Sequence, residues 1–208
     1  MPLPTPFSLG LDIGSTTVKL ALLDADGRIA ETRYRRHGTA IRATLAALLE
    51  ELLSLYPDIE VHCAITGSGA LDLCNTLSVP FVQELLSTAR TISTYAPDTA
   101  VAVELGGEDA KLLYLGTDTE LRMNESCAGG TGAFIDQMAR LLDTDAAGLN
   151  LLASRHTRLY PIASRCGVFA KTDIVPLLNG GVPREDIAAS IFQAVVEQTI
   201  GGLACGRP

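Results

Sequence analysis

Several features are missing from this sequence of 208 residues, and each absence excludes a class of protein. No apolar run approaches the roughly 18 residues that a membrane-spanning helix requires, so we expect a soluble protein with no membrane partner. The first ten residues, MPLPTPFSLG, lack the basic and apolar regions of a secretory signal. A formal net charge of −8 argues against a broad electrostatic interaction with nucleic acid or anionic lipid.

The cysteines form no recognisable disulfide or zinc pattern. There are five, an odd number, at positions 63, 74, 127, 166 and 205, and no two of them make a CxxC pair. This excludes a disulfide framework or a zinc ribbon and indicates reduced thiols, so we expect a cytoplasmic protein. A metal site would have to use distant residues or another chain.

The order of predicted elements indicates an α/β fold. Residues 7–36 predict three strands separated by a glycine turn and an Asp-Gly turn. A helix at 40–56, a strand at 60–67, a short helix in ALDLCNTL and a helix at 83–96 follow. After residue 101, strands give way to helices at about 131–143, 145–154, 168–179 and 184–204. No flexible linker separates the halves, so we expect two packed lobes, 1–98 and 99–208.

The opening pattern of the chain returns in its second half. LDIGSTTVKL (11–20) aligns with VELGGEDAKL (103–112) at a constant offset of 92 residues, and each copy continues into an apolar strand and a polar turn. The alignment places Asp12 on Glu104, Gly14 on Gly106, Ser15 on Gly107 and Lys19 on Lys111. Two unrelated hairpins could share an acid-x-Gly spacing, but acid, glycine, lysine and flanking strands together favour a duplication.

The duplicated hairpins predict a phosphate site. A glycine turn lets backbone N–H groups approach a phosphate closely, and Ser15, Thr16 and Thr17 add hydroxyl donors. The carboxylate of Asp12 would repel phosphate, so it is better suited to hold Mg²⁺ or to orient a water. Glu104, Glu108 and Asp109 could act in the same way. Lys19 and Lys111 are either phosphate ligands or solvated strand lysines.

Two cysteines stand where a thiolate would be stabilised. Cys127 precedes AGGTG and a predicted helix, and Cys166, which lies 39 residues further on, precedes another predicted helix. Helix N-terminal amides favour a thiolate, and thiolates are ligands for iron–sulfur clusters and zinc. Two copies of the chain would supply the four thiolates of a cubane cluster. The alternative is two ordinary half-buried cysteines.

The hairpin sequences resemble those of a known superfamily. LGLDIGSTTVKLALLD and VELGGEDAK resemble the first and second phosphate motifs of actin, sugar kinases and heat-shock chaperones, and ITGSG (65–69) resembles their strand-to-glycine turn. The resemblance implies an actin-like fold of two ribonuclease-H-like lobes with ATP between them. We expect Asp12, Glu104 and Glu108 to be catalytic. The residues expected to bind the cofactor are Gly14, Ser15, Thr16, Thr17, Lys19, Gly106, Gly107, Asp109, Lys111, Gly130 and Gly132.

The cysteine segments narrow the resemblance. NESCAGGTGAFIDQMARLL and SRCGVFAKTDIV resemble the cysteine motifs of the ATP-dependent activators of 2-hydroxyacyl-CoA dehydratases and benzoyl-CoA reductases, over residues 8–208. In that family two cysteines from each subunit of a homodimer hold one [4Fe–4S] cluster, which implies that Cys127 and Cys166 are metal ligands. Standard activators usually carry glutamine where this chain has Glu108.

The end of the sequence departs from the family pattern. Family members complete the second lobe with a further strand, a Gly-Gly turn and a helix, whereas this chain stops at IGGLACGRP. The resemblance therefore implies an incomplete second lobe and a fragment of the long, multidomain activator-like proteins. Nucleotide affinity would then be weakened.

The function implied by the resemblance is an ATPase coupled to low-potential, single-electron transfer. The expected cofactors are ATP or ADP, Mg²⁺ and the [4Fe–4S] cluster. The expected partners are a second copy or tandem module, a dehydratase- or reductase-like enzyme, and a ferredoxin- or flavodoxin-like donor. Two alternatives stay open: a cluster-free kinase of the same fold, and a non-catalytic module of a larger protein.

Overall fold

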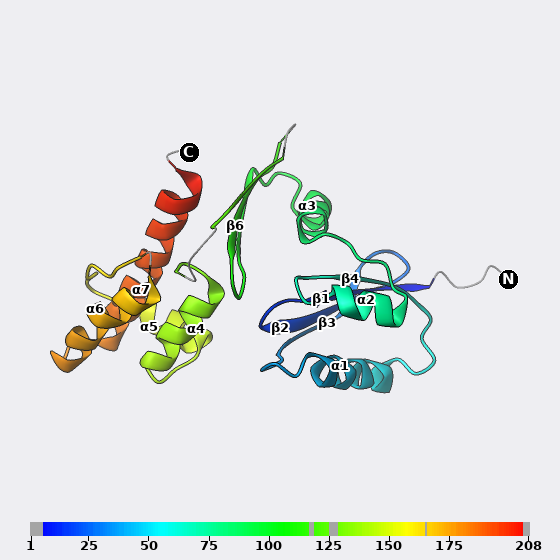
Figure 1. Ribbon diagram of the computed structural model, residues 1–208, viewed down its shortest axis with the longest axis horizontal. Helices are drawn as coiled ribbons and strands as arrows, with labels where there is room; N and C mark the ends of the chain where they lie inside the picture. Colours follow the sequence, from blue (N-terminus) through cyan, green and yellow to red (C-terminus); the bar gives the residue numbers. More distant parts are fainter. Residues whose placement is uncertain (1–5, 117–118, 125–128, 165, 206–208) are drawn as a thin grey trace. The chain divides into compact units, whose positions relative to one another are not determined.

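The computed structural model describes residues 6–116, 119–124, 129–164 and 166–205 (Figure 1). The chain divides into two compact units, Met1–Asp98 and Thr99–Pro208. Each unit has its own sheet and its own buried apolar cluster. The two units are therefore described separately.

A four-stranded mixed sheet forms the first unit. Its strands are β1 (Phe7–Ile13), β2 (Thr17–Leu23), β3 (Ile29–Arg36) and β4 (Val61–Thr66), in the spatial order β3-β2-β1-β4. The first three strands are antiparallel neighbours, and β4 runs parallel to β1. Helices α1 (Ile41–Leu55), α2 (Leu71–Leu77) and α3 (Glu84–Tyr95) complete the unit. The order β-β-β-α-β-α predicted from the sequence is thus confirmed.

The core of the first unit lies between the sheet and α1, which Figure 1 shows beside the strands. Alternate residues of a strand share one face, and residues three or four apart share one face of a helix. Both periods are visible in the buried cluster, which includes Leu9, Leu11 and Ile13 of β1, Val18, Leu20 and Leu22 of β2, and Leu45, Leu48 and Leu52 of α1.

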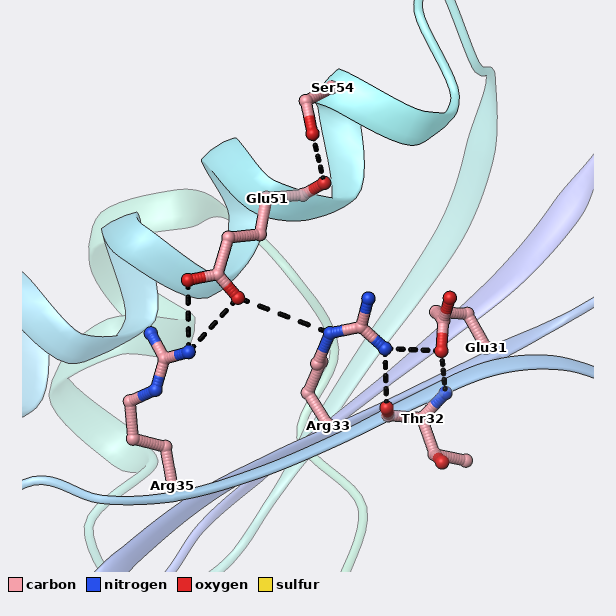
Figure 2. A network of polar contacts seen from close by, with 6 residues as sticks. All are labelled: Glu31, Thr32, Arg33, Arg35, Glu51 and Ser54. Carbon is pink, nitrogen blue, oxygen red and sulfur yellow. Dashed lines mark hydrogen bonds and ion pairs between the residues drawn. The ribbon is translucent and has the colours of Figure 1, made fainter.

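Polar contacts also join α1 to the edge strand β3 (Figure 2). The Glu51 carboxylate accepts hydrogen bonds from Nη2 of Arg35 at 2.9 and 3.0 Å, and Nε of Arg33 lies 4.0 Å from it. Arg33 also bonds to Glu31 of its own strand. Because these side chains are partly exposed, we expect the network to contribute less than about 1 kcal/mol.

The turn after β4 packs directly against the end of β1. Gly69 donates its N–H to the carbonyl oxygen of Ile13 at 2.9 Å. Gly67 has a positive φ of 104°, and a Cβ added there would lie 2.3 Å from the same oxygen. The ITGSG turn therefore needs glycine at Gly67, because no side chain fits between the turn and the strand that leads into Gly14.

A three-stranded antiparallel sheet opens the second unit. Its strands are β5 (Val101–Leu105), β6 (Ala110–Tyr114) and β7 (Glu120–Met123), in the order β5-β6-β7. The helices are α4 (Gly132–Leu141), α5 (Ala146–Ala153), α6 (Gly167–Asn179), α7 (Arg184–Gln198) and the π-helical turn η1 (Thr199–Ala204). The four helical regions predicted in this half are present, with bounds within a few residues of those expected.

The last helix is the centre of the second unit. Arg184–Ala204 is long and apolar enough, by length and composition alone, to cross a membrane. However, Ile187, Ile191 and Val195 are buried in one cluster with Phe134 and Met138 of α4. At its far end Leu203 packs against Leu112 and Tyr114 of β6. The apolar character of α7 is therefore that of a core helix.

We predict that Gly67→Ala destabilises the first unit by more than about 2 kcal/mol, because a Cβ in a left-handed conformation would meet backbone atoms. Gly27→Ala is the matched control, since Gly27 also has a positive φ of 77° but has nothing within 4 Å of an added Cβ. It should cost only about 1 kcal/mol. Urea unfolding followed by circular dichroism measures both, and equal losses would contradict the packing argument.

Candidate functional site

The first hairpin closes through a tight turn at Gly14. Its N–H donates to the carbonyl oxygen of Thr17 at 2.9 Å, which leaves Ser15 and Thr16 at the tip. Both are half-buried, whereas the Thr17 residue is only 5 % exposed at the base of the turn. Of the three hydroxyls expected to meet phosphate, those of Ser15 and Thr16 thus have the more accessible positions.

Asp12 and Lys19 are cross-strand neighbours below this turn. The Lys19 ammonium lies 2.7 Å from Oδ2 of Asp12, and the two side chains are 42 and 30 % exposed. The pair borders a cavity of about 750 Å³ on the sheet face opposite α1, beside the small residues Gly10, Ala21 and Ala64. The Asp12 carboxylate is therefore within reach of solvent and of a cation.

The second hairpin repeats this arrangement in the same register. Glu104 of β5 pairs across the sheet with Lys111 of β6, as Asp12 pairs with Lys19. Nζ of Lys111 lies 3.6 Å from Glu104 and 3.2 Å from Asp109, and its side chain is only 9 % exposed. The duplicated acid–lysine pair seen in the sequence thus corresponds to a duplicated contact.

The glycine turn of the second hairpin is covered by one of its own carboxylates. A Cβ added to Gly106 would lie 2.6 Å from Oδ1 of Asp109, so the Asp109 side chain folds back over this residue. Gly107 is half-buried and Glu108 is exposed. Glu104, Glu108 and Asp109 thus lie within one short stretch of the chain, although their side chains do not gather as a three-carboxylate metal site.

Both sides of the Cys127 segment are tied to this hairpin. Before the segment, Asn124 exchanges hydrogen bonds with Ala110, through its N–H at 3.1 Å and through its Oδ1 at 2.6 Å. After it, Gly132 donates its N–H to the carbonyl oxygen of Gly106 at 2.8 Å. Cys127 itself lies outside the described residues, so its predicted role as a ligand stays a prediction.

The glycines after Cys127 are needed for close packing. A Cβ on Gly132 would lie 3.0 and 3.1 Å from the carbonyl oxygens of Leu105 and Gly106, and one on Gly130 would lie 2.8 Å from Gln198 of α7. Thr131, fully buried between them, caps α4 by accepting the N–H of Phe134. Gly132 thus lets the start of α4 lie against the second hairpin, and Gly130 lets the same segment lie against α7.

Cys166 occupies the position before the first turn of α6. It is half-buried, and its carbonyl oxygen accepts the N–H of Ala170 at 2.9 Å. The N-terminal amides of this 13-residue helix favour the thiolate form, which is the form that binds metals. The chemistry of the Cys166 thiol therefore fits that of an iron–sulfur cluster ligand. Within the described residues no three His, Cys, Asp or Glu side chains gather as a metal site.

The other described cysteines have different surroundings. Cys74 is buried in the core of the first unit and Cys63 packs against the same cluster. Burial raises the pKa of the Cys63 thiol, and the neighbouring Cys74 adds to this effect. Cys205 is exposed. The Cys63 thiol is poorly suited to ligation, because a raised pKa disfavours the thiolate.

Sequence reasoning missed His37, which follows β3 and contacts the turn of the first hairpin. The residue is buried, its Nε2 lies 3.2 Å from the carbonyl oxygen of Gly14, and its Nδ1 accepts the N–H of Thr39 at 3.0 Å. A proton on Nε2 lets the ring make both bonds, so a neutral histidine supports the turn. No local pattern could have identified it, since it lies 23 residues from Gly14.

We predict that His37→Ala loosens the Gly14–Thr17 turn and lowers the free energy of unfolding by about 1–3 kcal/mol, because buried polar groups lose their partner. Hydrogen exchange of the Gly14 amide should become faster. Glu51→Ala is the control, since it removes the contacts of Figure 2 and leaves the turn intact. An unchanged Gly14 exchange rate in His37→Ala would show that the ring does not support the turn.

Solved structures resemble this fold closely. Component A of the (R)-2-hydroxyglutaryl-CoA dehydratase of Acidaminococcus fermentans superposes with a TM-score of 0.86 at 28% identity, covering 98% of this chain and 79% of that one. The activator of the 2-hydroxyisocaproyl-CoA dehydratase from Clostridium difficile, with bound ADPNP, gives a TM-score of 0.82 at 29% identity, covering 94 and 74%. These similarities confirm the predicted actin-like fold.

Sequence comparison agrees with the structural one. The (R)-2-hydroxyglutaryl-CoA dehydratase activating ATPase of Acidaminococcus fermentans is 30% identical over 199 residues, covering 94% of this chain and 76% of its own length. Residues 9–203 match the BadF/BadG/BcrA/BcrD ATPase family. The predicted family resemblance is confirmed, and the chain belongs to the BadF/BadG/BcrA/BcrD ATPase family.

Proposed function

We propose that this protein is an ATP-hydrolysing activator of a 2-hydroxyacyl-CoA dehydratase-like or benzoyl-CoA reductase-like enzyme. Two similar proteins are described as a dehydratase activating ATPase and a dehydratase activator, and the family is one of ATPases. In this proposal ATP hydrolysis drives the transfer of single electrons from a ferredoxin- or flavodoxin-like donor to the partner enzyme. The site of action is the cytoplasm, where free thiols such as Cys63 and Cys166 stay reduced.

One observation carries the proposal: the Cys127 segment is attached on both sides to the second hairpin. Asn124 is bonded to Ala110, and Gly132 is bonded to Gly106. A change at the Gly106 turn when a phosphate binds or leaves would therefore act on both flanks of Cys127. A kinase that only transfers phosphate has no need for a cysteine segment anchored to its phosphate turn.

The hairpins supply the groups that nucleotide hydrolysis needs. The turn amides near Gly14 and Gly106 and the hydroxyls of Ser15 and Thr16 bind phosphate oxygens. Asp12 and Glu104 hold Mg²⁺ or orient the attacking water. Lys19 and Lys111 hold these carboxylates in place through the ion pairs described above.

Cys127 and Cys166 of two modules, either two copies of the chain or a tandem pair, would hold one [4Fe–4S] cluster. The cluster, when bound, supplies one-electron chemistry at low potential. The surface beside Cys166 suits a second module, because Val168 and Phe169 in the first turn of α6 are 70 and 64 % exposed. Large apolar side chains in such a position favour burial against another protein.

We predict that Asp12→Asn and Glu104→Gln each lower the rate of ATP hydrolysis by at least about 100-fold, because a neutral amide binds Mg²⁺ less well than a carboxylate and cannot take a proton from the attacking water. Asp26→Asn is the control, since Asp26 lies in the exposed Asp24–Gly27 turn after β2. Phosphate release is the measurement. Full activity in Asp12→Asn would exclude this role for the carboxylate.

A second prediction concerns the metal. The wild-type protein, purified without oxygen, should contain about two irons and two sulfides per chain, because four irons are shared by two modules. Cys127→Ser and Cys166→Ser should each lose the iron and the brown colour, whereas Cys205→Ser should keep both. Iron and sulfide analysis with the visible spectrum tests this directly.

The same experiments separate the two rivals. A colourless protein whose ADP release depends on an added sugar or acid would favour a cluster-free kinase. A protein that contains zinc and lacks ATPase activity would favour a non-catalytic module. Iron retained in Cys166→Ser would show that this thiol is not a ligand, whatever the activity.

A further inference from the structure

Residues 156–164, which lie between α5 and Cys166, have no regular secondary structure, yet hydrogen bonds to two helices hold them in place. We name residues 156–164 the Cys166 arm, since the arm ends two residues before that cysteine. Its backbone N–H groups have few partners within the arm and bond to side chains of α6 and α7 instead. An irregular segment held in this way keeps its position only as long as those side chains are present.

Helix α7 provides the first set of acceptors. Oδ1 of Asp186 accepts the N–H of Thr157 at 2.7 Å and the N–H of Arg158 at 3.0 Å. One helical turn later, Oγ of Ser190 accepts the N–H of Tyr160 at 2.8 Å and donates to the carbonyl oxygen of Asp186 at 2.6 Å. The arm therefore runs along α7, over two positions of one helix face.

Asp186 and Ser190 are deeply buried, with residue exposures of 4 and 1 %. A buried carboxylate without partners would be costly, but here the backbone N–H of Thr157 is the main cause that keeps the pKa of Asp186 below its usual value. The Asp186 carboxylate is thus a buried acceptor for the N–H groups of the arm and not a surface charge.

Helix α6 holds the other end of the arm. Oδ2 of Asp173 accepts the N–H of Ala163 at 2.8 Å, three residues before Cys166. Ile162, beside it, is buried in the helical core. Because Asp173 lies on the helix that Cys166 opens, this bond joins the end of the arm to the element that fixes the backbone of Cys166.

The far end of α7 is attached to the second hairpin. In η1, which continues α7, the carbonyl oxygens of Leu203 and Ala204 accept hydrogen bonds from Nη1 of Arg122 at 3.1 and 2.6 Å. Leu203 also packs against Leu112 and Tyr114 of β6. Helix α7 and its continuation η1 therefore contact both the Cys166 arm and the second hairpin, which carries the proposed phosphate turn.

We infer that Asp186, together with Ser190 and Asp173, positions Cys166 by holding the Cys166 arm against α7 and α6. The inference rests on the proposed function only in taking Cys166 as a metal ligand. Asp186 makes no contact with the nucleotide or the metal in this scheme. It acts through the arm, and its loss displaces the thiol while the helices remain.

The experiment uses the full chain, reduced and free of metal, in four variants. Asp186→Ala removes the acceptor, and Asp186→Asn keeps an oxygen at Oδ1. Asp173→Ala removes the second anchor, and Asp143→Ala is the control, since Asp143 makes an exposed ion pair with Arg184 at the start of α7. The measurements are amide hydrogen exchange over residues 157–163 and the rate at which iodoacetamide alkylates Cys166, with exposed Cys205 as internal reference.

In Asp186→Ala the exchange of the arm amides should accelerate by at least about tenfold, because their bonds to the carboxylate are lost. Alkylation of Cys166 should change by about threefold or more relative to Cys205. Asp186→Asn should restore most of both values, and Asp143→Ala should match the wild type. If Asp186→Ala does not fold, Asp173→Ala provides the same test, because Asp173 is exposed.

Unchanged arm exchange and alkylation in folded Asp186→Ala and Asp173→Ala would overturn the inference. So would an equal acceleration in the arm and in helices α4 and α5, which would show a purely structural role. Iron analysis of the same proteins separates the two proposals. Wild-type protein without iron, combined with a loosened arm in the variants, rejects the cluster and keeps the positioning role. Iron retained with an unchanged arm rejects the positioning role alone.

Discussion

The hydrogen bond from the Gly132 amide to the Gly106 carbonyl is the contact on which the arrangement of the second unit depends. It joins the glycine turn of a strand hairpin to the start of a helix, and the two backbones lie so close that a Cβ at Gly132 would crowd the carbonyl oxygens of Leu105 and Gly106. A hydrogen bond between two backbone groups tolerates little change in length, so a displacement of the Gly106 backbone also moves the Gly132 backbone. In the proposed function this hydrogen bond would pass a displacement of the Gly106 turn to the residues that follow the Cys127 segment.

The first unit contains a similar backbone hydrogen bond, from a glycine to the strand that leads into its hairpin turn. There Gly69 donates its N–H to Ile13, next to the turn at Gly14, and His37 bonds to Gly14 from the other side. Both units thus support a hairpin turn with a glycine from a later segment. In the first unit the segment with Gly69 leads to the short helix α2, whereas in the second unit the segment with Gly132 follows Cys127 in the sequence. In the proposed function both hairpins would bind phosphate, while only the second is joined by hydrogen bonds to the flanks of a cysteine segment.

Much of this could be predicted from the sequence, because the relevant signals are local. Apolar periodicity predicted helices at 40–56 and 168–179, and the structure has them at Ile41–Leu55 and Gly167–Asn179. The repeat at offset 92 predicted two hairpins with the same acid–lysine spacing, and both pairs are cross-strand contacts.

What the sequence did not reveal depends on contacts between distant residues. His37 and Asp186 look like ordinary polar residues in their own segments, and they acquire a role only from partners 23 and 29 residues away. The predicted last helix, 184–204, is continuous, but its final turn is π-helical where Gly201 and Gly202 weaken the α-helical preference. Neither effect has a local signal that periodicity detects.

The charges around the second hairpin explain why a nucleotide would need a cation there. Lys111 brings one positive charge, and it lies within 4 Å of two carboxylates, those of Glu104 and Asp109. Glu108 adds a further negative charge at the tip of the turn. A triphosphate approaching this turn would meet net repulsion at short range, where water screens little. In the proposed function, Glu104 and Asp109 would hold a Mg²⁺ ion, which would supply the positive charge that offsets this repulsion. The Gly106 turn, which supports Gly132, would then be the part of the chain nearest to any change in that charge.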